Sequence, residues 1–176
     1  MDYLTAIKAY TPKNEQEETD KAFFLAFAAA NPNCLLREND AAHFTASAWC
    51  VNQAHDKVLM VYHNIYDSFS WTGGHADGEQ NLLHKAMEEA KEETGIITLI
   101  PLTGAILSID VLPVKVHVKR GKEIKAHQHY NIAYGFIASD KELLQIKPDE
   151  NSNVCWIALD DWQSRCNEAH MVPVYE

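Results

Sequence analysis

Hydrophobic and polar residues recur along this chain with two periods, one typical of helices and one typical of strands. Residues 14–30 follow the helical period, with Asn14 suited to cap the segment, glutamates in its first turn and aromatic residues near one face. Residues 80–94 form the strongest helical pattern, and Gly95 is well placed to end it. The pattern therefore predicts two main helices, separated by a long stretch of different character.

Runs with strand character occupy much of the remaining chain. The predicted strands cover residues 43–51, 57–62, 104–112, 115–119, 126–138 and 154–157. The first two are separated by a short polar stretch, 52–56, which suggests a hairpin. We expect Gly73-Gly74 and Gly78 to break the chain, a turn at 120–122 to join two strands, and a short helix at 160–167 to close the domain. Strands interleaved with helices indicate an α/β sandwich.

Composition and charge exclude several classes of protein. With 176 residues, 47% of them hydrophobic, the chain can bury a proper core. Its 25 acidic and 15 basic residues give a formal charge of −10, which argues against a broad surface for a nucleic acid polymer. The longest apolar stretch, 22–30, is too short to cross a bilayer, and the acidic N-terminus does not resemble a signal peptide. We expect a soluble, cytoplasmic protein with no membrane association and with free cysteines.

The candidate chemistry lies at the end of the second predicted helix. Glu89, Glu92 and Glu93 stand at positions i, i+3 and i+4, so their carboxylates share one narrow helix face. Such crowding raises carboxylate pKa values unless a divalent cation neutralises the charge, and Mg²⁺ and Mn²⁺ prefer oxygen ligands. Helical spacing alone favours a solvated acidic surface, because acidic helix faces are common. The glycine-rich segment before the helix shifts the balance towards a metal site.

This region resembles the Nudix box. That box has a glycine, a glutamate six positions later, and then an Arg-Glu pair, an apolar residue, a Glu-Glu pair, a glycine and an apolar residue at fixed spacing. The matching residues here are Gly74, Gln80, Glu88, Glu89, Ala90, Glu92, Glu93, Gly95 and Ile96. Two positions depart from the box, since Gln80 replaces the first glutamate and Glu88 replaces the arginine. In the family that arginine orients the catalytic carboxylates, and Lys85, one turn before Glu89, could take its place.

The resemblance implies a fold, a reaction and a set of site residues. It implies a Nudix-type α/β/α sandwich with a mixed β-sheet, as a single domain over residues 1–176 with a helical extension at 1–40 and a core at 41–176. It implies hydrolysis of a nucleoside diphosphate linked to another group, a small-molecule substrate, with Mg²⁺ or Mn²⁺ as cofactor. The implied metal ligands are Gly73, through its carbonyl, Glu89, Glu92 and Glu93. The implied catalytic residues are Glu89 and Glu92 with Glu150 from a later loop, with Asp149 as second choice.

Three basic residues are candidates for contact with the substrate. His127 and His129 alternate on one strand face, and they could reach a substrate or metal or be satisfied polar groups at a strand edge. Arg120 could meet phosphate oxygens, although exposed hairpin charges are commoner. His75 is expected to shape the glycine turn or to face water.

Two other functions compete with hydrolysis. A catalytically weak Nudix-fold sensor would bind a nucleotide without cleaving it, and the departures at Gln80 and Glu88 are its only support. The isoprenoid isomerase that shares the fold relies on a cysteine near the box, whereas no cysteine lies between Cys50 and Cys155. The sequence does not identify the group linked to the diphosphate, and it leaves open whether the chain forms a homodimer, as is common in the family.

Overall fold

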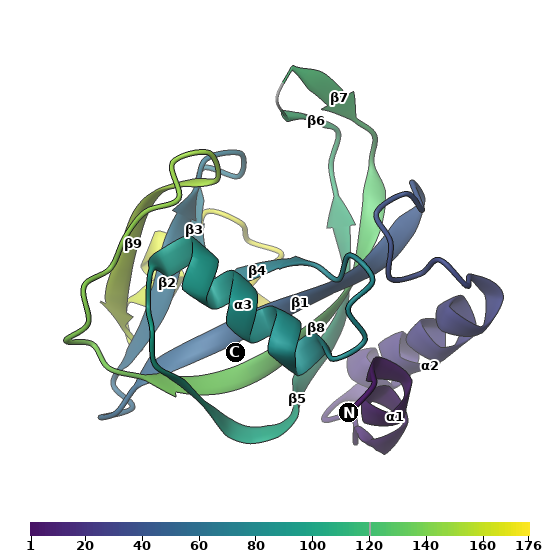
Figure 1. The fold of residues 1–176 in the computed structure, drawn as a ribbon, viewed down its shortest axis with the longest axis horizontal. Helices are drawn as coiled ribbons and strands as arrows, with labels where there is room; N and C mark the ends of the chain where they lie inside the picture. The colour runs from purple at the N-terminus through teal and green to yellow at the C-terminus, as the bar shows by residue number, and fades with distance from the viewer. Residues whose placement is uncertain (120) are drawn as a thin grey trace.

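The computed structural model describes residues 1–119 and 121–176, and the side chains of Lys119 and Lys122 also lie outside that description. Figure 1 shows a strongly curved sheet with one long helix lying across it and two further helices beside it. The helices are α1 (Tyr3–Ala9), α2 (Glu15–Ala30), α3 (Leu82–Thr94), α4 (Trp162–Arg165) and α5 (Val172–Tyr175). The strands are β1 (Ala42–Asn52), β2 (Lys57–His63), β3 (Ser68–Ser70), β4 (Thr72–His75), β5 (Leu99–Val114), β6 (His117–Lys119), β7 (Lys122–Ile124), β8 (His127–Ala138) and β9 (Asn151–Ala158).

Strand β1 organises the sheet. It pairs in parallel with β8 along its whole length, from Ala42 opposite Gln128 to Asn52 opposite Ala138. Its other edge pairs in an antiparallel sense with β4 and, near its end, with β2. The described strands form one mixed sheet in the order β3-β2-β1-β8-β5, with β9 paired to β2, and a separate β6–β7 hairpin that extends away from it (Figure 1). The mixed sheet expected from the sequence is confirmed.

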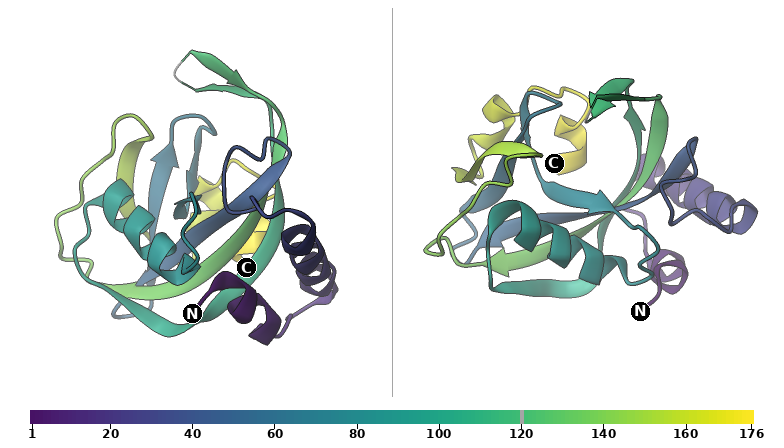
Figure 2. Two further views of the ribbon diagram at one scale, coloured as in Figure 1. Left: turned by 45° about the vertical axis from the view of Figure 1, so that its right-hand side comes forward. Right: turned by 45° about the horizontal axis from the view of Figure 1, so that its top comes forward.

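Two cores cover the two faces of the sheet, because side chains alternate along each strand. One core joins Phe44 and Ala46 of β1 to Phe24 of α2 and Ala86 of α3. The other core joins strand residues to the C-terminal helices, and it contains Val58, Met60, Phe69, Ile157, Trp162, Met171 and Tyr175. Figure 2 shows the C-terminal segment on the side of the sheet away from α3. Helices therefore lie on both faces.

Both predicted helices form with the expected ends. The Asn14 side chain accepts a hydrogen bond from the Glu17 N–H at 2.9 Å, which caps α2. At the C-terminal end of α3, Gly95 adopts φ 72°, and its N–H donates to the carbonyl of Lys91 at 2.9 Å. A left-handed residue at this position favours glycine, because a side chain there is strained.

The structure corrects the sequence prediction in three places. Gly73 and Gly74 do not break the chain but lie within β4 and pair with β1. The hairpin expected between β1 and β2 is short, since only Cys50 and Val51 pair with β2. Helix α1 was not predicted at all. The turn expected at 120–122 includes Arg120, which lies outside the described residues, although β6 and β7 on either side do pair.

The structure also bears on the predictions about the cysteines and about membrane-spanning helices. All four cysteines are free thiols, and Cys34 and Cys50 are buried. In the described part of the chain, no helix has both the length and the apolar character needed to cross a bilayer.

Candidate functional site

The acidic face of α3, made of Glu89, Glu92 and Glu93, lies against strand β4. Leu82, Ala86 and Ala90 form the buried stripe of the helix and fix its rotation on the sheet. The three carboxylates stand along the border of that stripe, where Glu93 is buried and Glu92 reaches water. Their burial differs accordingly: the Glu92 side chain is 58% exposed, whereas that of Glu89 is 12% exposed.

The two glycines of β4 each contact a carboxylate of α3, and Gly74 makes room for one of them. A Cβ atom on Gly74 would lie 2.3 Å from Cδ of Glu89, which is far inside van der Waals contact. The Gly73 N–H donates to Oε1 of Glu93 at 3.4 Å. Because Gly74 has no side chain, the Glu89 carboxylate reaches the strand backbone directly, whereas a Cβ on Gly73 would meet Ala46 and Ser47 of β1. The structure thus brings together Gly73, Glu89 and Glu93, as the sequence analysis predicted.

Glu93 shows the electrostatic cost of this arrangement. Burial and the negative charges of Glu89 and Glu150 raise the pKa of Glu93 to about 8, although the hydrogen bond from Gly73 works in the opposite direction. A carboxylate in such surroundings is stable as an anion only when a positive charge compensates it. The site therefore has the donor atoms and the excess negative charge that suit a hard divalent cation.

A lysine on the preceding turn contacts the acidic face. Lys85 Nζ lies 2.7 Å from Oε1 of Glu89, and both side chains are largely buried. Burial works to lower the pKa of Lys85, but its hydrogen bond to Glu89 and the charges of nearby acids outweigh burial and raise the pKa. Glu88 is 45% exposed and lies 3.8 Å from His84. Lys85 thus pairs with Glu89, whereas Glu88 lies near His84.

The loop before β9 closes the other side of the site. Lys147 Nζ lies 3.2 Å from Oε2 of Glu92 and 3.0 Å from Oε2 of Glu150, so one ammonium group joins the two carboxylates. Asn151 anchors the loop to the helix end by donating a hydrogen bond to the Glu93 carbonyl at 3.0 Å. Glu150 is therefore held beside the acidic face.

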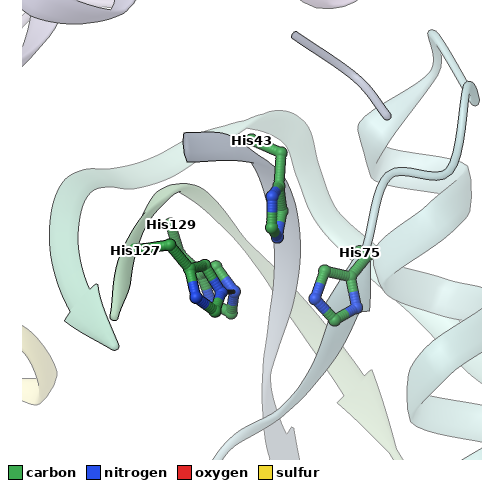
Figure 3. A group of neighbouring side chains, drawn as sticks. All are labelled: His43, His75, His127 and His129. Carbon is green, nitrogen blue, oxygen red and sulfur yellow. Dashed lines mark hydrogen bonds between the residues drawn. The ribbon is translucent and has the colours of Figure 1, made fainter. Parts of the chain in front are cut away.

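The other face of the same strands carries a second group of polar side chains. His127 and His129, both on β8, meet His43 of β1 and His75 of β4, and their rings point towards one another (Figure 3). We call these four residues the histidine cluster. One ligand nitrogen from each ring lies within 4.8 Å of the others. Burial and the charge that neighbouring histidines would carry lower the pKa of His129 to about 2, so its ring is neutral at pH 7.

Sequence reasoning found half of this cluster. The spacing of His127 and His129 places them on one strand face, but His43 and His75 come from distant segments. The signal that was available is the strand period: His43 lies in a predicted strand, and its partner His129 could be identified only from the register of β1 with β8. The remaining candidate, Arg120, lies outside the described residues.

Comparisons with known proteins place this geometry in context. The family model described as "NUDIX domain" matches residues 41–176. Among solved structures, the Ap4A hydrolase of C. elegans in a binary complex is 18% identical, with a TM-score of 0.54, 75% of this chain covered and 91% of that chain. A NUDIX-family hydrolase from Clostridium perfringens is 24% identical, with a TM-score of 0.51, and the match covers 71% of this chain and 87% of that chain. The E. coli dihydroneopterin triphosphate pyrophosphohydrolase is 14% identical, with a TM-score of 0.53, and the match covers 76% of this chain and 92% of that chain. A search among curated proteins finds no match. The α/β fold with a mixed sheet predicted from the box is confirmed.

Proposed function

The chain belongs to the Nudix family, and from that premise we propose that it hydrolyses a small diphosphate compound with the help of a divalent metal ion. The substrate class is a nucleoside diphosphate linked to another group. The observation that carries the proposal is the approach of two helix carboxylates to strand β4: Glu89 fills the space beside Gly74, and Glu93 accepts a hydrogen bond from the Gly73 N–H. A merely solvated acidic helix would not need a neighbouring strand without side chains.

The residues present fit Mg²⁺ or Mn²⁺. Three carboxylates and the Gly73 carbonyl supply only oxygen donors, which these hard cations prefer. The absence of a Cβ at Gly74 leaves room for the Glu89 carboxylate beside strand β4. When bound, such an ion offsets the charge of the diphosphate oxygens and lowers the pKa of the attacking water.

The protein's own groups would share the remaining work. Glu89, Glu92 and Glu93 would hold the ion, Glu89 or Glu92 would accept the proton of the attacking water, and Glu150 would be the further acidic group from a later loop. The oxygen of that water forms a new bond to one phosphorus, and the bond from that phosphorus to the bridging oxygen breaks. The bridging oxygen leaves with the second phosphoryl group. Lys85 is a positioning residue, because its ion pair fixes the direction of the Glu89 carboxylate.

Contacts to the rest of the substrate are less well defined. Arg120 remains a prediction for a phosphate contact, whereas the sequence left His127 and His129 open between a substrate, a metal ion and a structural role. Selectivity in an enzyme of this type depends on loops outside the box, so the proposal does not choose among diphosphate classes. Dimer formation and a cytoplasmic location also stay predictions.

A substrate panel tests the proposal. Purified protein is incubated with nucleoside triphosphates, nucleotide sugars, dinucleoside polyphosphates and coenzyme derivatives, each with Mg²⁺, with Mn²⁺ and with a chelator. We expect metal-dependent turnover of at least one class, reduced about 100-fold or more in Glu92→Gln, because a metal ion contributes several kcal/mol to the transition state. Glu88→Gln is the matched control, since it makes the same change at an exposed position on the same helix. Recovery of every compound uncleaved, with one of them bound, would favour the sensor.

A further inference from the structure

The histidine cluster differs in chemistry from the acidic face. Four rings converge from three adjacent strands: His43 is the register partner of His129, His127 lies two residues before it on the same face of β8, and His75 faces them from β4 (Figure 3). The ring centroids of neighbouring pairs lie 4.9 to 5.2 Å apart. The donors are all nitrogen, and nitrogen ligands suit Zn²⁺, Co²⁺ and related transition ions better than Mg²⁺.

The hydrogen bonds show which ring nitrogens face the centre. His43 Nδ1 lies 3.2 Å from the Asn39 carbonyl, and His127 Nδ1 lies 2.8 Å from the Lys125 carbonyl. A carbonyl can only accept, so each Nδ1 carries the proton and each Nε2 presents a lone pair. Metal-binding histidines usually have this second hydrogen bond, which fixes the tautomer.

If only hydrogen bonds linked the four rings, one of these lone pairs would have no partner. His127 Nε2 and His129 Nε2 lie 3.1 Å apart, so one N–H from His129 can satisfy His127. His43 is only 4% exposed, and within the described residues its buried Nε2 has no hydrogen-bond partner. A buried acceptor without a partner is costly, and a cation at the centre would satisfy it.

We propose that the histidine cluster is a binding site for one divalent transition-metal ion of the Zn²⁺ class, separate from the acidic face of α3. Zn–N bonds of about 2.0–2.1 Å in a tetrahedron put the four nitrogens roughly 3.3 Å apart. The 3.1 Å contact between His127 and His129 already matches that spacing, and the nitrogens farthest apart, at no more than 4.8 Å, would have to approach by up to about 1.5 Å. Three of the four side chains are partly exposed, which gives the ion a path from solvent.

The site would act on structure rather than on hydrolysis. Four protein ligands close a tetrahedral shell and leave no position for water, which is typical of structural zinc sites. The ion would tie β4 to β1 and β8 at His75, one residue beyond the Gly73-Gly74 pair that receives the helix carboxylates. It would thereby fix the glycine strand against α3. This inference rests on the histidine geometry and does not depend on the proposed hydrolysis.

Cobalt spectroscopy tests the site directly. Metal-free protein is titrated with Co²⁺ in the presence of excess Mg²⁺, which occupies oxygen sites, and then with Zn²⁺. We expect one Co²⁺ per chain with the strong visible bands of tetrahedral coordination, displaced by Zn²⁺, and a rise in Tm of about 5 °C or more at saturating Zn²⁺. Affinity should fall at least about tenfold in His127→Gln and in His75→Gln, both partly exposed positions.

Two controls separate this site from the acidic face. His170→Gln removes an exposed histidine elsewhere and should leave the Co²⁺ bands unchanged, as should Glu92→Gln. Circular dichroism confirms that each variant is folded. The proposal is overturned if folded wild-type protein gives no tetrahedral bands, if both cluster variants keep them, or if Glu92→Gln abolishes them.

Discussion

Strand β4 separates two groups of side chains with opposite chemistry. On the side of α3, Gly74 meets the carboxylate of Glu89, and the donors are oxygens with excess negative charge. On the other side, His75 meets three further histidines, and the donors are imidazole nitrogens. The first group has ordinary Nudix spacing along the sequence, whereas the second is assembled only by strand register. The difference shows that a short segment, 73–75, can serve two sites because successive strand residues face opposite ways.

The two groups should also change the stability of the folded protein in opposite directions as pH changes. The pKa of Glu93 is raised above its ordinary value, so the folded protein holds that proton more tightly than the unfolded chain does, and this contribution to stability is lost as pH rises from about 4.5 to 8. The pKa values of His43 and His129 are lowered mainly by burial, so the unfolded chain takes up the protons, and stability is lost as pH falls below about 6.5.

The largest expected effect comes from filling the space in the glycine strand. Gly74→Ala places a Cβ against Glu89 and should displace that carboxylate, with a fall in kcat of about 100-fold. The fold should survive, because only the end of a flexible side chain must move. Gly135→Ala is the matched control, since its Cβ meets the end of Leu102 at 2.7 Å, away from the site. Equal activity in the two variants would mean that the glycine strand does not position Glu89.

The next effect is on stability in metal-free protein. As pH rises from 6 to 8, ionisation of the buried Glu93 carboxyl should lower the free energy of unfolding by about 2 kcal/mol. This pH dependence should be absent in Glu93→Gln. Urea denaturation at several pH values in a chelator measures this difference between wild type and variant. Parallel pH profiles for the two proteins would show that Glu93 ionises normally.

A smaller effect concerns Lys85, which we propose takes the place of the arginine of the box. Lys85→Met should lower kcat about tenfold with little change in KM, because the Glu89 carboxylate loses its ion pair. Lys85→Arg should restore most of the loss. The control is Lys91→Met, an exposed position on the same helix. A pure KM effect in Lys85→Met would assign Lys85 to substrate binding instead.

The smallest effect is expected at the position where the box normally has arginine. Glu88→Arg should change kcat less than about twofold, because the side chain is exposed and Lys85 already contacts Glu89. Steady-state kinetics with the substrate found in the panel gives the answer. A gain of tenfold would show that position 88 does orient the carboxylates and that the native glutamate weakens the enzyme.

Local features of the fold could be predicted from the sequence, and long-range features could not. The two main helices follow from caps and periodicity within a few residues, which is why Asn14 and Gly95 were placed correctly. Glycine pairs usually indicate a break because glycine weakens a strand, yet in β4 the missing side chain of Gly74 admits Glu89. The parallel pairing of β1 with β8 joins segments more than 80 residues apart. No local pattern contains that register, so His43 and His75 could not be joined to His127 and His129.

The most direct test of the central account is hydrolysis in ¹⁸O-labelled water with the substrate that the panel identifies. We predict that a single ¹⁸O enters one phosphate-bearing product, that its rate of entry depends on Mg²⁺ or Mn²⁺, and that this rate falls about 100-fold or more in Glu89→Gln but not in Glu88→Gln. Label entering at an unchanged rate in folded Glu89→Gln protein would contradict the assignment of the acidic face of α3 as the hydrolytic site.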